Sequence, residues 1–131
     1  MALNKALALW DVRKLGLVTP YRDDVQREIV RNFEWIGIEI GEGMERHLRV
    51  ENNNDIADIG EEVLDRLVGG AVDAVTTFCT NLVAAQRVEF WEKKYGVPVF
   101  DIVTTVVWDM LRECGVDATK LEGWGMMFKK R

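Results

Sequence analysis

The chain has 131 residues, of which 48% are apolar and 30% charged, and its formal net charge is −5 at pH 7. This balance is typical of a folded globular domain and argues against disorder, and the acidity argues against bulk binding of nucleic acid. No stretch reaches the roughly 18 apolar residues of a membrane span, and the first residues lack the layout of a signal peptide. We therefore expect one soluble, cytoplasmic domain over residues 1–131.

Two cysteines, Cys79 and Cys114, fall within apolar patterns. We expect both to be buried free thiols in a reducing compartment rather than a disulfide. The single histidine, His47, is interpreted as a structural or surface residue, and two cysteines with one histidine do not form the usual thiolate zinc site. The sequence contains no serine, so it has no Ser-His-Asp triad, and no nucleophile is evident near the histidine.

Apolar residues recur at steps of three and four through most of the chain, which predicts an all-α fold. A first helix fits residues 2–15. A long second helix fits about residues 20–49, because Thr19 is a good N-cap and Pro20 suits the first helical position. Its apolar stripe runs through Ile29, Phe33, Ile36, Ile40, Met44 and Leu48.

A third helix fits residues 55–95, and Gly69-Gly70 in its interior marks a kink or a tight helix crossing. A fourth helix fits residues 99–114, although its run of β-branched residues makes a strand a competing interpretation. Asp117 caps a short final turn. The expected architecture is four main antiparallel helices and a short C-terminal helical turn.

The two long helices each carry an acidic face. The acidic residues are Glu34, Glu39, Glu42 and Glu45 in the second helix, and Asp55, Asp58, Glu62, Asp65 and Asp73 in the third. The short connection between the helices makes them antiparallel neighbours, a core pair over residues 19–95, so the two faces can converge in one cleft. Two interpretations stay open: solvated outer faces, which are usual for surface helices, or a cation site.

Two pairs of carboxylates within these faces are spaced three residues apart, Glu39 with Glu42 and Glu62 with Asp65. Hard oxygen ligands of this kind suit Mg²⁺ or Mn²⁺, and magnesium commonly adds substrate phosphates to its coordination. The four carboxylates are therefore candidate metal ligands, and they suggest phosphate-ester or phosphoanhydride chemistry.

Residues 38–45 resemble the first motif of the MazG-like all-α nucleoside triphosphate pyrophosphohydrolases, in which a Glu-Glu-x-x-Glu helix precedes a Glu-x-x-Asp helix. The resemblance covers about residues 20–85 and departs from the family pattern at Ile38, where the family has glutamate. It implies a MazG-like helical bundle that hydrolyses a nucleoside triphosphate to the monophosphate and pyrophosphate. It also implies dimers or tetramers, Glu39 or Glu42 as catalytic base, and Mg²⁺ held by Glu39, Glu42, Glu62 and Asp65.

Four further residues are candidates for binding the nucleotide. Trp35 could stack on a base, and phosphates could be met by Arg87, Lys93 and Lys94. The same residues also suit structural roles, with Trp35 as a semi-exposed packing residue and the cations at the C-terminus of a helix.

An interpretation from a different class is a non-catalytic helical module whose acidic outer faces bind a basic protein partner. Five Trp and five Met in 131 residues exceed what four helices readily bury, so we expect a homo-oligomer, most simply a dimer. Convergence of the acidic faces favours the enzyme, and separate outer faces favour the interaction module.

Overall fold

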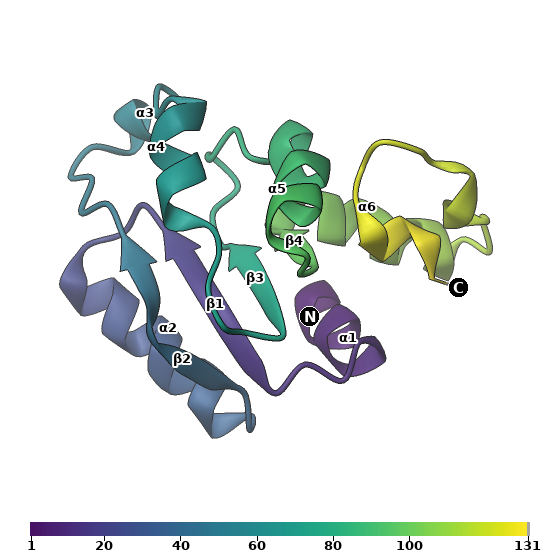
Figure 1. Cartoon of the computed structure of the whole chain (residues 1–131), viewed down its shortest axis with the longest axis horizontal. Coiled ribbons are helices and arrows are strands. Elements are labelled where there is room, and N and C mark those ends of the chain that lie inside the picture. Colours follow the sequence, from purple (N-terminus) through teal and green to yellow (C-terminus); the bar gives the residue numbers. More distant parts are fainter. Residues whose placement is uncertain (131) are drawn as a thin grey trace.

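The computed structural model describes residues 1–130 and shows a four-stranded parallel β-sheet with helices on both faces (Figure 1). The strands are β1 (Lys14–Thr19), β2 (Glu39–His47), β3 (Ala74–Thr77) and β4 (Val99–Asp101), in the order β2-β1-β3-β4. The helices are α1 (Ala2–Leu9), α2 (Asp23–Trp35), α3 (Asn53–Ile56), α4 (Glu61–Leu67), α5 (Val88–Tyr95) and α6 (Ile102–Glu113), with 3₁₀ turns at Ala85–Arg87, Ala118–Lys120 and Met126–Lys129. The all-α prediction is therefore wrong, and the fold is α/β.

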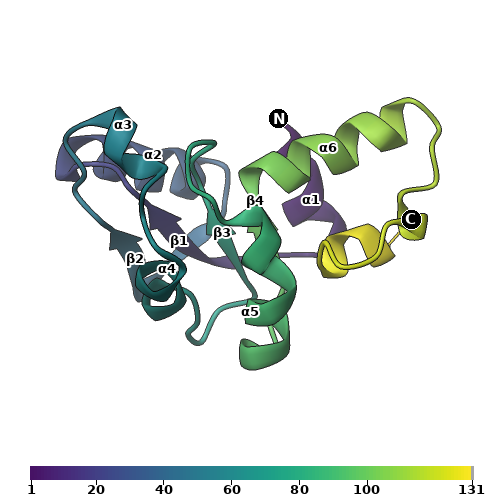
Figure 2. The same ribbon diagram turned by 90° about the horizontal axis from the view of Figure 1, so that it is seen from above.

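Each face of the sheet is covered by its own hydrophobic core, because successive side chains of a strand point to opposite faces. Leu15, Leu17 and Phe100 belong to the core that also contains residues of α1, α2 and α6. Val18 and Val99 belong to the core formed with α3, α4 and α5. Figure 2 shows the sheet between these layers, with α1, α2 and α6 above the strands and α4 and α5 below them.

The strands were not predicted from the sequence because they are short and buried on both faces of the sheet. Apart from the edge strand β2, they have between three and six residues, and nearly all of these residues are buried. Parallel strands covered on both sides form continuous apolar runs without a period of two, and such runs are hard to distinguish from buried helix. The first two residues of β1 fell at the end of the predicted first helix and the other four in the predicted connection, whereas β3 fell inside the predicted third helix.

The predicted second helix is in fact a helix followed by an edge strand. α2 ends at Trp35, Gly37 adopts φ +84°, and the chain turns back to place β2 beside β1. The β1–β2 register shifts between Leu15, which pairs with Ile40, and Leu17, which pairs with Glu45. The three- and four-residue apolar steps beyond Trp35 therefore matched a helix by coincidence.

The glycine pair in the predicted third helix marks the end of a helix and not a kink. Gly69 and Gly70 have φ of +114° and +129°, a conformation that favours glycine, and they carry the chain from α4 toward β3. A Cβ on Gly70 would lie 1.9 Å from the sulfur of Met44 in β2. The backbone must therefore pass close to the edge strand, which explains the need for glycine here.

The C-terminal part agrees in part with the sequence reading. Residues 99–101 form a strand and residues 102–113 a helix, so each of the two competing interpretations holds for a segment. The carboxylate of Asp101 caps α6 by accepting the N–H groups of Val103 and Thr104, and that of Asp117 accepts the N–H of Thr119 in the short final turn. None of the helices among the described residues is long and apolar enough to cross a membrane.

Candidate functional site

The carboxyl ends of the parallel strands lie along one edge of the sheet. The chain leaves β1 to form β2 on one side, and later returns to form β3 on the other side of β1. The topological switch point therefore lies between β1 and β3, and in open α/β sheets this is where ligands bind. The segments that follow these two strands, residues 20–22 and 78–82, define the candidate site.

Cys79 and Tyr21 meet at this switch point. Phe78 extends the pairing of the strands by donating its N–H to the carbonyl of Val18 at 2.8 Å, which fixes the residue that follows it. Cys79 is a free, buried cysteine that is 7% exposed, and its thiol is hydrogen-bonded to the side chain of Tyr21. The prediction for Cys79 is confirmed, whereas Cys114 is exposed and its predicted burial is wrong.

The phenol of Tyr21 is held in its protonated form. Burial, together with the hydrogen bond and the negative charge of Cys79, raises the pKa of Tyr21 to about 12. A phenol that keeps its proton is a hydrogen-bond donor throughout the neutral range, and a thiolate is the nucleophilic form of cysteine. The arrangement therefore pairs a nucleophile with a permanent donor.

Polar groups flank the cysteine on both sides along the edge. Thr80 and Asn81 follow it directly and are exposed. In the strand before it, the Thr77 hydroxyl donates to Asp101 Oδ2 at 2.9 Å. Burial raises the pKa of Asp101, and its other oxygen caps α6, so this carboxyl joins β3, β4 and α6 rather than facing a ligand.

The four predicted metal ligands are not brought together. Glu39 and Glu42 are exposed on the edge strand β2, where Glu39 forms an ion pair with Lys14 at 3.8 Å, and Glu62 is exposed in the first turn of α4. No group of three or more His, Cys, Asp or Glu side chains within residues 1–130 is placed to hold a metal ion. The acidic faces therefore do not form a shared cleft among the described residues, and Mg²⁺ binding stays a prediction.

Asp65 has a structural role in joining α4 to α5. Its carboxylate accepts two bonds from Arg87, at 3.1 and 2.7 Å, and one from Trp91 Nε1 at 2.7 Å. The hydrogen bonds from Arg87 are the main reason why the pKa of Asp65 is lowered. The carboxylate and the guanidinium thus satisfy each other, and Arg87 has a structural role at the N-terminus of α5 rather than at the C-terminus of a helix as predicted.

The other predicted nucleotide contacts lie away from the cysteine. Trp35 is 89% exposed at the end of α2. Lys93 forms an ion pair with Glu89 one turn earlier, at 3.4 Å, and Lys94 lies over the rings of Phe90 and Tyr95. These positions give no common binding surface for a nucleotide, and self-association through exposed groups such as Trp35 stays a prediction.

The sequence reading missed Tyr21 and the functional placement of Cys79. The available signal was the run Val75–Thr77, β-branched and buried, which ends directly before Phe78-Cys79 and follows the two glycines. Once that run is read as a strand, the cysteine falls at the carboxyl end of a parallel sheet, where functional side chains gather. Read as helix, the same cysteine is only a core residue.

The fold and the site together define an α/β protein with a free, buried cysteine at the switch point of a parallel sheet. The family model described as Amdase, arylmalonate decarboxylase, matches residues 1–128. The chain therefore belongs to this family.

Individual relatives agree with the family assignment. The maleate isomerase of Nocardia farcinica (strain IFM 10152) is 31% identical over 116 residues, which cover 85% of this chain and 45% of that protein. One solved structure is the Nocardia farcinica maleate cis-trans isomerase, in a cysteine-to-serine variant with a covalently bound succinylcysteine intermediate. It superimposes with a TM-score of 0.87 and is 25% identical, and the match covers 99% of this chain and 54% of that one. A structure of arylmalonate decarboxylase, 21% identical, gives a TM-score of 0.81 over 99% and 59% of the two chains and shares the fold.

These findings overturn the nucleotide interpretation. The chain is not a member of the MazG-like family, and its relatives are isomerases and decarboxylases rather than pyrophosphohydrolases. The motif residues Glu39 and Glu42 lie on a strand and not on the helix that the resemblance required. The chain spans about half the length of the relatives that it matches.

Proposed function

We propose that this chain carries the nucleophilic cysteine of an enzyme that acts on a small unsaturated dicarboxylic acid, with cis-trans isomerisation of maleate as the reaction. The observation that carries the proposal is the placement of Cys79 at the switch point with the Tyr21 hydroxyl on its thiol. The relationship to a maleate isomerase, and the succinylcysteine described for such an enzyme, support it.

The chemistry needs a thiolate and a group that orients it. The Cys79 thiolate adds to one carbon of the C=C bond, forming a C–S bond, and the π electron pair moves to the neighbouring carbon and into its carboxylate. The remaining C–C single bond can rotate. Return of the electron pair expels the thiolate and leaves the trans acid, so atoms and charges balance without a cofactor.

The chain's own residues supply the donors for this step. The Tyr21 hydroxyl directs the thiolate, and Thr80 and Asn81 next to it offer a hydroxyl and an amide to the carboxylates of the substrate. Donors placed where negative charge develops stabilise the transition state more than they stabilise the ground state.

The test incubates the chain with maleate and follows both fumarate, by proton NMR, and a covalent adduct, by intact-protein mass. We expect one maleic acid to add to Cys79, with the adduct lost in Cys79→Ser and retained in Cys114→Ser. Formation of the adduct depends on this chain alone, whereas turnover also depends on residues in the part of the relatives that this chain does not cover. An adduct that still forms in Cys79→Ser contradicts the proposal. The proposal is also contradicted if the parent chain forms no adduct with maleate while iodoacetamide still modifies Cys79.

A second candidate reaction is the decarboxylation of an arylmalonate, which the description of the matching family names. Loss of CO₂ leaves an electron pair next to the remaining carboxylate, and Cys79 would then deliver a proton instead of forming a C–S bond. Release of CO₂ from an arylmalonate, without an adduct on maleate, identifies this alternative.

A further inference from the structure

The loop that carries Tyr21 is held by the segment that follows β2. The backbone N–H groups of residues 48–50 donate to the carbonyls of residues 19–21 at 2.8 to 3.2 Å, and Arg49 N–H is the donor to Tyr21. The N–H of Tyr21 in turn donates to Thr19 Oγ1 at 3.3 Å. The main chain of Tyr21 is therefore fixed on both sides by contacts that lie outside the candidate site.

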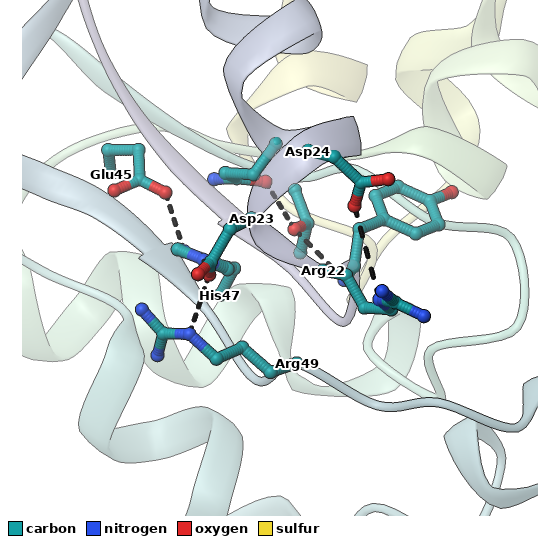
Figure 3. Close-up of polar contacts among 9 residues, drawn as sticks. Arg22, Asp23, Asp24, Glu45, His47 and Arg49 are labelled. Carbon is teal, nitrogen blue, oxygen red and sulfur yellow. Dashed lines mark hydrogen bonds and ion pairs between the residues drawn. The ribbon is translucent and has the colours of Figure 1, made fainter.

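Side chains reinforce this hold two residues after Tyr21. Asp23 is the first residue of α2, and its Oδ1 lies 2.6 Å from His47 Nε2 and 2.6 Å from Arg49 Nε. On the other side of the imidazole, His47 Nδ1 lies 2.6 Å from Glu45 Oε1 (Figure 3). The side chain of His47 is 10% exposed, so the ring is enclosed between α2 and the edge strand.

The imidazole lies between two carboxylates, Asp23 on one side and Glu45 on the other. The hydrogen bond from His47, followed by that from Arg49, lowers the pKa of Asp23. A hollow of about 480 Å³ beside the ring is lined by further charges of α2, namely Arg27, Glu28 and Arg31.

Arg49 adopts a backbone conformation that is unfavourable for its residue type. Its φ is +54°, in the left-handed region that is unfavourable for a non-glycine residue. In this conformation its N–H reaches Tyr21 while its guanidinium reaches back to Asp23. Strain of this kind persists only where surrounding contacts maintain it, and it commonly occurs beside functional sites.

We propose that Asp23, His47 and Arg49 are positioning residues that hold the loop after β1 so that the Tyr21 hydroxyl reaches the Cys79 thiol. The proposal rests on the proposed function of Tyr21 and Cys79. His47 is two positions beyond Glu45 on the outer strand and acts through the loop, without touching the thiol.

The test measures the rate at which iodoacetamide alkylates Cys79 in the full chain. Cys114→Ser provides the background, because it leaves Cys79 as the single thiol. His47→Gln removes the imidazole, and Asp23→Asn weakens the same contact from the helix side without altering the enclosed ring. We expect each to slow alkylation by about threefold to tenfold, a limited effect because the backbone contacts of residues 48–50 remain.

Asp24→Asn is the matched control, since Asp24 is the next carboxylate of α2 and its ion-pair partner is Arg22 at 4.0 Å rather than His47. Its alkylation rate should equal that of the background. A double-mutant cycle with Tyr21→Phe then tests whether His47 and Asp23 act on Cys79 through Tyr21. In the Tyr21→Phe background, His47→Gln and Asp23→Asn should have no further effect.

Three outcomes overturn the positioning proposal. The first is an unchanged alkylation rate in His47→Gln and Asp23→Asn. The second is that these two substitutions slow alkylation as much in the Tyr21→Phe background as without it, and the third is that Asp24→Asn slows alkylation as much as Asp23→Asn does. If Tyr21→Phe itself leaves alkylation unchanged, the pairing of Tyr21 with Cys79 fails and the positioning proposal fails with it. If Tyr21→Phe slows alkylation while His47→Gln does not, only the positioning proposal is lost.

Discussion

A buried carboxylate of α5 holds the C-terminal segment onto the sheet. Glu92 is 6% exposed, and its two oxygens accept the backbone N–H of Val99 at 3.0 Å and that of Met126 at 2.7 Å. Val99 begins β4 and Met126 begins the last 3₁₀ turn, so a single side chain joins three segments. Replacing Glu92 with alanine should therefore destabilise the fold and release the C-terminal turn.

The size of the effect follows from the two donors. A buried N–H that loses its acceptor costs about 1 to 3 kcal/mol, and Val99 is 1% exposed, so its amide has no route to water. Met126 is half-buried, and its amide can be partly rehydrated. We expect Glu92→Ala to lower the free energy of unfolding by about 2 to 4 kcal/mol, or to lower the Tm by roughly 10 °C for a domain of this size.

The assay is urea unfolding followed by tryptophan fluorescence, with hydrogen exchange at Val99 and Met126 as the local readout. Glu89→Ala is the matched control, because Glu89 lies on the same helix and forms only a surface ion pair with Lys93 at 3.4 Å. That variant should change the free energy of unfolding by about 0.5 kcal/mol or less. Equal losses in the two variants, or unchanged exchange at Val99 and Met126, would refute the reasoning.

The same residue has a characteristic pH dependence. Burial raises the pKa of Glu92, although the two N–H bonds act in the opposite direction. The folded state therefore holds this proton more tightly than the unfolded state, in which a glutamate has a pKa of about 4.3. The contribution of Glu92 to stability is complete below that value and declines as the pH rises through the raised pKa, and Glu92→Gln should abolish the decline.

Two further predictions concern contacts outside the site. Asp65→Asn should lower the free energy of unfolding at neutral pH and have little effect in acid. The pKa of Asp65 is lowered in the folded state, so its contribution to stability is present above about pH 3.9 and is lost as the pH falls through the folded pKa. Unfolding midpoints of the variant and the parent at pH 7 and pH 3 test this, and an equal difference at both pH values contradicts the prediction. Gly70→Ala should destabilise the chain by at least 2 kcal/mol or so, since its Cβ would lie 1.9 Å from the sulfur of Met44 at φ +129°. Gly60→Ala, which meets nothing within 4 Å, is the control, and equal melting temperatures would count against the close approach.

The sequence determined the local features that depend on neighbouring residues. The helices at residues 2–9 and 102–113, the Asp117 cap and the free, buried thiol of Cys79 follow from apolar spacing and side-chain chemistry, and the structure contains each of them. Gly37 and the Gly69-Gly70 pair are visible as interruptions in the sequence, but their consequence is not, because glycine in a helical pattern can mark a kink or an end.

Only the tertiary structure decided that the chain is built on a parallel sheet. Parallel pairing joins segments that are distant in sequence, such as Leu15 with Ala74 and Val75 with Val99, and strands buried on both faces have no period to reveal them. The acidic pairs at residues 39–42 and 62–65 looked alike in sequence. The first lies on an exposed edge strand, whereas in the second Asp65 binds Arg87 and Trp91 while Glu62 is exposed. The contact between Tyr21 and Cys79 exists because β1 and β3 lie side by side, a fact set by long-range packing and not by the spacing of residues along the chain.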